Sequence, residues 1–328
     1  MKREIRKSHN YGLTLVELLI GLTLSLLILG GAVSVFISSK ESFRLEEDLS
    51  AMQENFRFIA DRLNKDLSMV GYTGCAMPYV DNTPTVDAFV AGIGVTDVIQ
   101  GVEGGANPDT LTVSFALPES GIPIIDGGAT LASPLYVSKN LPLYNALSDN
   151  FSSGSPVPVT LLVGNCDHAN IFLVTGVADA TTPNGFDGGS ISHATGVTIG
   201  GVSNTSTTLS DRYGASDVNT ASAFELESVT YQITTVSGVT GLYESRNGGA
   251  NQLVLDNVTD FQVLYGIDSS TSEDGNADHY VDWSGTLRIS DITSLKVTLT
   301  MIVSQQNGND VTRDYSFTVK LRDMGLDV

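Results

Sequence analysis

A basic head followed by a long apolar run opens the chain. Lys2, Arg3, Arg6 and Lys7 precede a stretch from Leu18 to Ile37 that has no charged side chain over 20 residues. At a rise of about 1.5 Å per residue, this run predicts a helix of about 30 Å, which is the thickness of a membrane's hydrocarbon core. The basic head is expected in the cytoplasm and everything after Ser38 outside it. A secretory signal peptide is the first alternative, but no convincing A-x-A cleavage site follows Ile37.

A second helical pattern continues directly from the apolar run. From Lys40 onward, apolar residues recur at spacings of three and four, which is typical of one face of an amphipathic helix: Leu45, Leu49, Met52, Phe56, Ile59, Leu63, Leu67 and Val70. No proline precedes Pro78, so we expect one unbroken helix over residues 13–70, membrane-spanning to about residue 37. Its outer half is expected to pack on its own domain, and an independent coiled coil is the alternative.

Short apolar runs separated by Gly, Pro, Asn and Asp replace the helical pattern after Pro78, and no further helix is expected there. Candidate strands lie at residues 109–115, 158–163, 171–175, 228–236 and 242–246. The clearest alternation of apolar and polar residues is at 297–303 and 315–321, and these two strands are expected to pair in antiparallel fashion. Residues 176–223, rich in small and polar side chains, predict a long loop-rich insertion. The fold class is therefore α+β, a long N-terminal helix packed on an antiparallel β-sheet head over residues 71–328.

The start of the apolar run carries a motif as well as a helix. Residues 12–20, GLTLVELLI, closely resemble the processing motif of type IV prepilins and of the pseudopilins of type II secretion. The resemblance implies that the prepilin peptidase cuts after Gly12, which leaves residues 1–12 as a leader, and methylates the new N-terminus at Leu13, where most members have Phe. It also implies that Glu17 pairs with the N-terminal amine of a neighbouring subunit during assembly. A carboxylate within an apolar span is costly without a partner, which agrees with that role.

Several segments beyond the helix resemble the PilW-like minor pilins of type IV pili, and the type II secretion pseudopilin J is related in organisation. The segments are residues 71–75, 109–113, 229–231, 241–243, 258–268 and 317–322. The resemblance implies a type IV pilin-like fold and a minor pilin that enters the pilus, at or near its tip, to prime or support assembly for twitching, adhesion or DNA uptake.

The same resemblance implies a set of partners and a location. The expected partners are the prepilin peptidase, other minor pilins, the major pilin, the inner-membrane assembly platform and membrane lipid. The protein would cross the bacterial inner membrane once with its head in the periplasm, and after assembly it would lie in the pilus on the cell surface. The alternatives are a minor pseudopilin of type II secretion, whose loss would block secretion and leave pili intact, and a membrane-anchored adhesive or binding domain with no filament role.

Charge and residue usage exclude several other functions. The chain has 17 basic and 37 acidic residues, a net charge of −20, so it repels phosphate backbones and nucleic-acid binding is not expected. No Gly-x-Ser-x-Gly motif is present and the four histidines are scattered, so neither a catalytic site nor a cofactor is predicted.

Two smaller features remain open from the sequence. Cys75 and Cys166 both lie beyond the membrane segment, where a disulfide between them is expected, with free structural thiols or a catalytic thiol as the alternatives. Asp274, Asn276 and Asp278 place oxygen atoms at alternate positions, as in a calcium loop. His279 stands where that loop needs glycine, so a solvated acidic turn is the preferred interpretation and calcium the weaker one.

Overall fold

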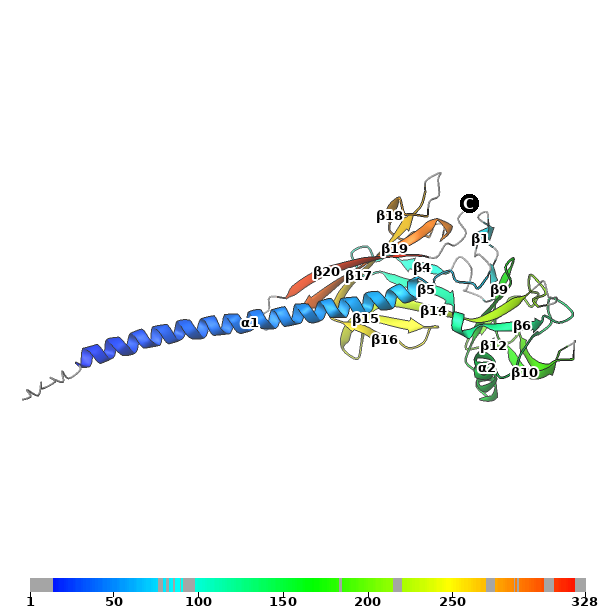
Figure 1. Cartoon of the computed structure of the whole chain (residues 1–328), viewed down its shortest axis with the longest axis horizontal. Coiled ribbons are helices and arrows are strands. Elements are labelled where there is room, and N and C mark those ends of the chain that lie inside the picture. Colours follow the sequence, from blue (N-terminus) through cyan, green and yellow to red (C-terminus); the bar gives the residue numbers. More distant parts are fainter. Residues whose placement is uncertain are drawn as a thin grey trace, which may run out of the picture.

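A long helix extends from one side of a two-lobed, β-rich head (Figure 1). The computed structural model of the chain describes residues 14–75, 79–80, 83–84, 86–88, 90, 98–182, 185–214, 220–269, 275–285, 287, 289–303 and 310–321. The architecture confirms the predicted α+β, pilin-like class, because one apolar helix precedes a large and mostly antiparallel head.

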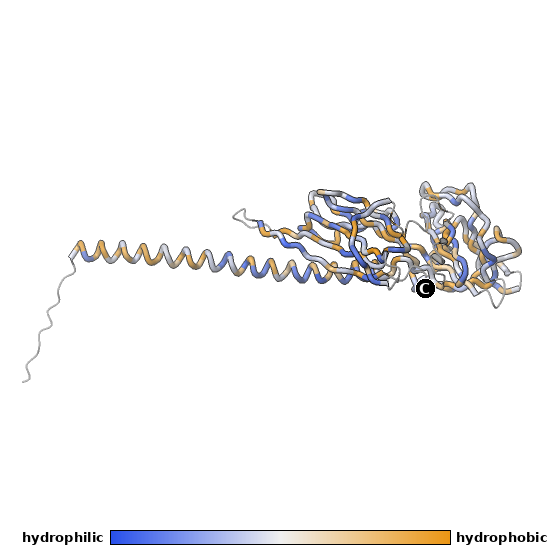
Figure 2. The backbone as a smooth tube through the Cα atoms, turned by 90° about the horizontal axis from the view of Figure 1, so that it is seen from above, coloured by the Kyte–Doolittle hydropathy of each residue, from blue (hydrophilic) through white to orange (hydrophobic). Residues whose placement is uncertain are grey.

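Helix α1 (Leu15–Leu67) runs for 53 residues without a break, as the absence of proline predicts. Thr14 caps its start, because the Thr14 hydroxyl accepts a hydrogen bond from the backbone N–H of Glu17 at 3.3 Å. The chain leaves the helix through Ser68 and reaches Gly71, whose φ of 75° favours glycine. The half of α1 that lies away from the head is predominantly hydrophobic, whereas polar residues increase toward the head (Figure 2).

The inner lobe of the head surrounds the end of α1. Five strands form one of its layers: β4 (Ile99–Val102), β5 (Thr110–Ala116), β14 (Ala221–Val236), β15 (Val239–Arg246) and β16 (Gln252–Asp256). Four form the other: β17 (Val258–Ile267), β18 (His279–Val281), β19 (Ile292–Val303) and β20 (Val311–Lys320). The predicted antiparallel pairing of the last two strands is confirmed by β19 and β20, in which Val297 lies opposite Phe317. The connecting residues 304–309 lie outside the described chain.

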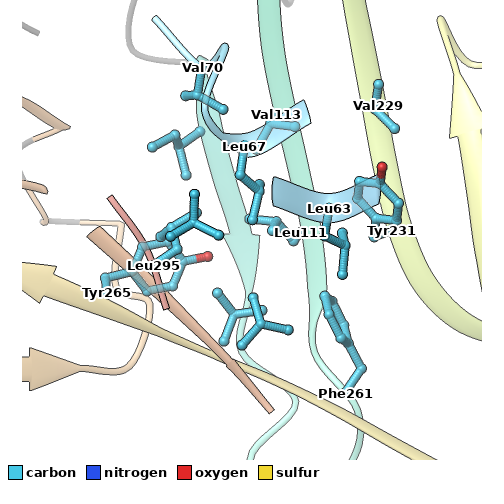
Figure 3. Packing of buried hydrophobic residues seen from close by; sticks show 14 of the residues in the cluster. Leu63, Leu67, Val70, Leu111, Val113, Val229, Tyr231, Phe261, Tyr265 and Leu295 are labelled. Atoms are coloured by element: carbon cyan, nitrogen blue, oxygen red, sulfur yellow. The ribbon is translucent and has the colours of Figure 1, made fainter. Parts of the chain in front are cut away.

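The core of the inner lobe is shared by the helix and both layers. Ile59, Leu63 and Leu67 of α1 are fully buried and pack with β5, β14, β17 and β19 (Figure 3). The apolar stripe read from the sequence therefore packs on the protein's own head rather than on an independent coiled coil.

The outer lobe lies beyond the end of α1 (Figure 1). Its sheet contains β3 (Val86–Ala88), β6 (Ile122–Asp126), β7 (Leu135–Val137), β8 (Thr160–Gly164), β9 (Ala169–Leu173), β10 (Gly176–Thr181) and β11 (Asp187–Ser192). Small pairs are formed by β1 (Tyr79–Val80) with β2 (Thr83–Pro84) and by β12 (Thr198–Ile199) with β13 (Val202–Ser203). The described chain also contains two short 3-10 turns, η2 (Pro118–Ser120) and η3 (Ile289–Asp291). Among the described strands, β3 and β9 alone pair in parallel.

Strand β14 belongs to both lobes. Its first residues pair with β6 and β8 of the outer lobe, for example Ala223 opposite Val163. The rest of the strand pairs with β5 and β15 of the inner lobe, for example Val229 opposite Val113. One continuous strand of 16 residues thus carries hydrogen bonding from one lobe into the other.

Two details of the head differ from the sequence-based expectation. The absence of a helix beyond Pro78 was wrong, because α2 (Pro142–Ser152) starts with proline at its first turn and buries Leu143, Tyr144 and Leu147. The segment 176–223, predicted to be loop-rich, also contains β10 to β13 and the start of β14 between its loops. Its buried Ile191 and Tyr213 fix those strands on the outer-lobe core.

Candidate functional site

The first functional feature is the exposed apolar half of α1. Within the described residues, α1 is the one helix long and apolar enough to cross a membrane, and none of its most apolar stretch is buried in the chain. Two of its hydroxyl groups are bonded within the helix, since Thr23 donates to the carbonyl of Leu19 at 3.0 Å and Ser25 to that of Gly21 at 2.7 Å. In lipid, backbone N–H and C=O groups must be bonded within the protein, and an α-helix bonds them within itself.

Glu17 is the acidic residue in the first turn of this helix. Its side chain is exposed among apolar neighbours, of which Leu18 is 58% and Val16 63% exposed. The positive end of the helix dipole favours a carboxylate there. The two predicted processing residues, Gly12 and Leu13, lie outside the described residues.

The outer half of α1 is seated on the head by apolar and aromatic packing. Phe56 stacks on Tyr315 of β20 with ring centroids 4.8 Å apart and meets Phe317 edge-on at 5.9 Å. Phe43 and Phe58, in contrast, are 70% and 59% exposed on the same helix. The helix therefore has one face packed on its own head and a second face that carries exposed large apolar side chains.

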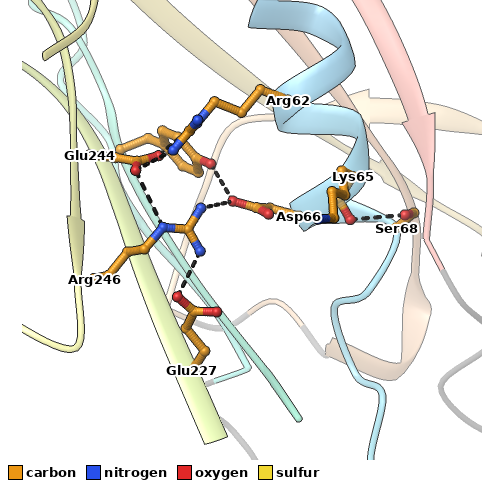
Figure 4. A network of polar contacts seen from close by, with 8 residues as sticks. Arg62, Lys65, Asp66, Ser68, Glu227, Glu244 and Arg246 are labelled. Carbon is orange, nitrogen blue, oxygen red and sulfur yellow. Dashed lines mark hydrogen bonds and ion pairs between the residues drawn. The ribbon is translucent and has the colours of Figure 1, made fainter. Parts of the chain in front are cut away.

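A partly buried set of charges joins the helix to the sheet, and we call it the helix–sheet charge cluster: Arg62, Asp66, Glu227, Glu244 and Arg246 (Figure 4). Arg62 binds Glu244 through two nitrogens, one at 2.9 Å. Arg246 contacts three carboxylates, Asp66 at 2.7 Å, Glu227 at 2.7 Å and Glu244 at 3.2 Å. The cluster thus pairs two cations with three anions, drawn from the last turns of α1, from β14 and from β15.

Burial and hydrogen bonding together set the ionisation of this cluster. Burial of Glu244 would raise its pKa, but hydrogen bonds from Arg62 and Arg246 outweigh burial and lower the pKa below 4.5. The pKa of Tyr231 is raised by burial and by its hydrogen bond to the Asp66 carboxylate at 2.6 Å. The Glu244 carboxylate is therefore held in the charged form, and Tyr231 as a neutral donor, at neutral pH.

The two cysteines form a disulfide between Cys75 and Cys166, which confirms the predicted pairing. Cys75 follows the end of α1, and Cys166 lies in the turn between β8 and β9. The Asn165 side chain shapes that turn, since its oxygen accepts hydrogen bonds from the N–H groups of Asp167 at 2.9 Å and His168 at 2.7 Å. The disulfide therefore ties the end of the helix to the outer lobe.

The weak calcium candidates are only partly within the described chain. Asp274 lies outside it, and Asn276 already has a polar partner. Asp278 accepts a hydrogen bond from the N–H of Ser269 at 3.0 Å. Across the residues that the structure describes, no three His, Cys, Asp or Glu side chains are grouped so that they could hold a metal ion.

Sequence reasoning missed the helix–sheet charge cluster. Arg62 and Glu244 are separated by 182 positions, and in the sequence Arg62 belongs to the charged face between the apolar positions. One signal was available, because Glu244 directly follows the buried apolar residues Leu242 and Tyr243 of β15. A charge inside such a run needs a partner.

Comparison with known proteins gives one match. The family model described as Type IV Pilus-assembly protein W matches residues 230–325. The matched segment covers the second part of β14, from residue 230, and all of β15 to β20, which are strands that hold the outer half of α1. Neither a search of curated proteins nor a search of solved structures found a match. The chain is thus PilW-like over residues 230–325, which confirms the resemblance to PilW-like minor pilins and supports a role in type IV pilus assembly.

Proposed function

We propose that this protein is a minor pilin that is cleaved after Gly12, methylated at Leu13 and incorporated into the type IV pilus. The observation that carries the proposal is the combination of a PilW-like C-terminal segment with an α1 half that is apolar and exposed throughout. An exposed apolar helix is stable in lipid, and outside lipid it needs other apolar surfaces to cover it. Neighbouring pilin helices are such surfaces.

Glu17 would set the register of this docking. After cleavage, the new α-amine would lie four residues before Glu17 along the chain, so a neighbouring subunit can present an ammonium group at the same depth in the membrane. An unpaired carboxylate in the apolar phase is costly, and a facing ammonium offsets much of that cost. The pair would therefore form when two helices align and would be absent when they slip.

The packing of α1 on the head supports a subunit in which helix and head form one rigid unit. Buried Ile59, Leu63 and Leu67, the helix–sheet charge cluster and the disulfide all fix the last turns of the helix. A helix held in this way would determine where its head lies relative to its neighbours. The exposed Phe43 and Phe58 lie outside the membrane segment and offer further apolar contacts to those neighbours.

The outer lobe favours a place at or near the pilus tip. It lies at the end of the molecule away from the exposed helix half (Figure 1), where a subunit in the body of a filament would have neighbours. A tip subunit has free space on that side. We propose the prepilin peptidase, other minor pilins, the major pilin and the inner-membrane platform as partners, with the head periplasmic before assembly.

The first test is mass spectrometry of sheared surface filaments and of the membrane fraction. The expected result is a peptide that begins at Leu13 with an added methyl group, present in the filaments. The same peptide found in the membrane alone would favour a pseudopilin or a basal priming subunit. A membrane protein that keeps residues 1–12 would overturn the proposal at its first step.

The second test separates assembly from processing. We expect Glu17→Ala to be cleaved and methylated normally and to remain in the membrane, with its amount in sheared filaments falling at least tenfold relative to wild type. Glu41→Ala is the matched control, since Glu41 is also an exposed glutamate of α1 but lies beyond the apolar run, and its amount in filaments should not change. Equal amounts of both variants in filaments would contradict the role of Glu17.

A further inference from the structure

A groove of about 260 Å³ lies where the two lobes meet. Its floor is the face of β5 and β14 that is turned away from α1. Val113 of β5 and Val229 of β14 are buried in the core that holds the helix. Because successive side chains of a strand project from opposite faces, the next residues, Ser114 of β5 and Ser228 of β14, project from the other face and line the groove.

No charged side chain of the described residues projects from this floor into the groove. Glu225 of β14 is the charged residue along the groove, but it alternates with Leu226, which lines the floor. Its side chain therefore lies on the opposite face of the strand, together with that of Glu227 in the helix–sheet charge cluster. A charged ligand would lose its hydration in such a groove without gaining an ion pair, so the groove favours an uncharged one.

Two serines lie side by side in the floor. Ser114 and Ser228 are directly opposite each other on the paired strands β5 and β14. The N–H of Ser228 donates to the side-chain oxygen of Asn247 at 2.9 Å, and its carbonyl accepts from the N–H of Asn247 at 2.8 Å, so both backbone groups of Ser228 point away from Ser114. Opposite residues of this non-hydrogen-bonded kind have Cα atoms about 4.5 Å apart, which brings the two hydroxyl groups together.

The hydroxyl groups of this serine pair are available to a ligand. Among the residues that the structure describes, neither hydroxyl has a hydrogen-bond partner. The neighbouring Thr112 hydroxyl, in contrast, is bonded to that of Thr230 at 2.8 Å. Ser114 is 6% exposed and lines the groove, so a ligand would reach its hydroxyl from there. A hydroxyl in such a largely buried position gains free energy from a ligand group that hydrogen-bonds it.

The side of the groove formed by the outer lobe is apolar and closely packed. Pro158, Val159 and Val202 line it. Gly200, in the turn between β12 and β13, has a φ of 57°, and a Cβ atom at this position would lie 2.9 Å from the ring of Pro158. A glycine is needed for this approach, so the turn holds the apolar wall beside the hydroxyl-bearing floor.

The arrangement of the groove argues against an extended peptide as its ligand. A peptide that adds to a sheet needs a free edge of backbone groups. In the floor, β14 is paired with β5 on one side, and on the other side Ser228 is bonded to Asn247. The volume of about 260 Å³ is slightly below the roughly 300–1,000 Å³ of pockets for drug-sized ligands, so it suits a ligand of about one ring.

We propose that the groove between the lobes binds one neutral sugar residue of a glycan. A sugar ring carries hydroxyl groups, which would bond Ser114 and Ser228, and a face of C–H groups, which would pack on Pro158 and Val202. The described lining includes no aromatic side chain on which the ring could stack, so we expect millimolar affinity for a single residue. The proposal concerns this groove alone and holds whether or not the protein enters a filament.

The test is methyl NMR on the full chain, with labelled valine and leucine side chains, in a detergent that has no sugar head group. The probes are the methyl glycosides of glucose, galactose and N-acetylglucosamine. Methoxycyclohexane, a six-membered ring without hydroxyl groups, is the matched ligand control. We expect at least one glycoside to shift the methyl signals of Val202 and Leu226 in a saturable way. The methyl signals of Leu63 and Val113, in the core that holds the helix, should not move.

A double substitution tests the serine pair. Ser114→Ala with Ser228→Ala removes two hydrogen bonds to the sugar and should weaken binding of the glycoside at least about fivefold. Thr298→Ala with Ser316→Ala is the matched control, because these two hydroxyls also lie opposite each other, on β19 and β20 away from the groove, and this variant should bind as wild type does.

The core methyl signals report whether each variant is folded. The proposal is overturned if no glycoside shifts the groove methyl signals in a saturable way, or if methoxycyclohexane shifts them as strongly as the glycosides do. It is also overturned if the folded double variant of Ser114 and Ser228 binds the glycoside less than about fivefold more weakly than wild type.

Discussion

Arg246→Met tests how much the helix–sheet charge cluster contributes to stability. Arg246 contacts Asp66, Glu227 and Glu244, whose side chains are 7%, 14% and 2% exposed. Removing one partner of a buried ion pair typically costs about 3–5 kcal/mol, because the other charge is left buried. Here Arg62 still binds Glu244 and the Arg246 side chain is itself 30% exposed, so screening reduces the loss. We therefore expect a loss of about 2–3 kcal/mol in the free energy of unfolding at pH 7.

The assay is urea unfolding of the full chain in detergent, followed by tryptophan fluorescence. The chain has 1 tryptophan, Trp283, which packs on Tyr265 of the inner-lobe core with ring centroids 5.0 Å apart, so its emission reports on the lobe that holds α1. Arg57→Met is the matched control, since Arg57 is an exposed arginine of the same helix, and it should change stability by less than about 0.5 kcal/mol.

The pH dependence of the stability lost in Arg246→Met tests whether the loss is electrostatic. The pKa of Glu244 is lowered in the folded protein, so the stability from this ionised group is present above its ordinary pKa of 4.5 and is lost as the pH falls through the folded value. Below pH 4.5 the wild type should lose stability, and the gap to Arg246→Met should narrow. The electrostatic reasoning would be refuted if Arg246→Met lowered the free energy of unfolding by less than about 1 kcal/mol at pH 7. It would also be refuted if the difference in stability between wild type and Arg246→Met were the same at pH 7 and below pH 4.5.

Two further substitutions test the packing of the head. Replacing both Cys75 and Cys166 by serine removes a link across a sequence separation of 91 residues. In the loop-entropy account, this lowers the free energy of unfolding by about 4 kcal/mol. Urea unfolding checks the expected loss, and a midpoint equal to that of wild type would contradict it. Gly101→Ala places a Cβ atom 2.5 Å from the Tyr265 hydroxyl, so we expect a loss of about 1–3 kcal/mol in the free energy of unfolding. The control is Gly176→Ala, whose Cβ atom meets nothing closer than 3.8 Å and whose stability should stay near that of wild type. Equal thermal midpoints for the two variants would show that the core accommodates the methyl group of Gly101→Ala.

The helix and the strand order near the C-terminus could be predicted because their signals are local. The spacing of Ile59, Leu63 and Leu67 contains the helix period and identifies the buried face without any knowledge of the partner. Alternation around Val297 and Phe317 likewise identifies two strands with one buried face each, and a short connection makes antiparallel pairing the simplest choice.

The division of the head into lobes could not be predicted, because it depends on contacts between distant residues. Nothing in the local pattern of β14 shows that Ala223 faces Val163 in one lobe while Val229 faces Val113 in the other. The short helix α2 was missed because no side chain caps its start and its three buried residues span little more than one turn. Its one clear signal was Pro142 at the first helical turn.

The connection between the lobes also determines how the molecule would respond to a mechanical pull. A force applied to the outer lobe reaches the inner lobe along the backbone of β14, whose hydrogen bonds to β5 and β15 lie across the strand and would be loaded in shear. It also reaches the end of α1 directly through the bond between Cys75 and Cys166. For a pull applied beyond Cys166, that covalent bond bypasses the residues between the two cysteines, which then bear no load while it is intact. Under such a pull, the length that can be extended is limited to the chain beyond Cys166.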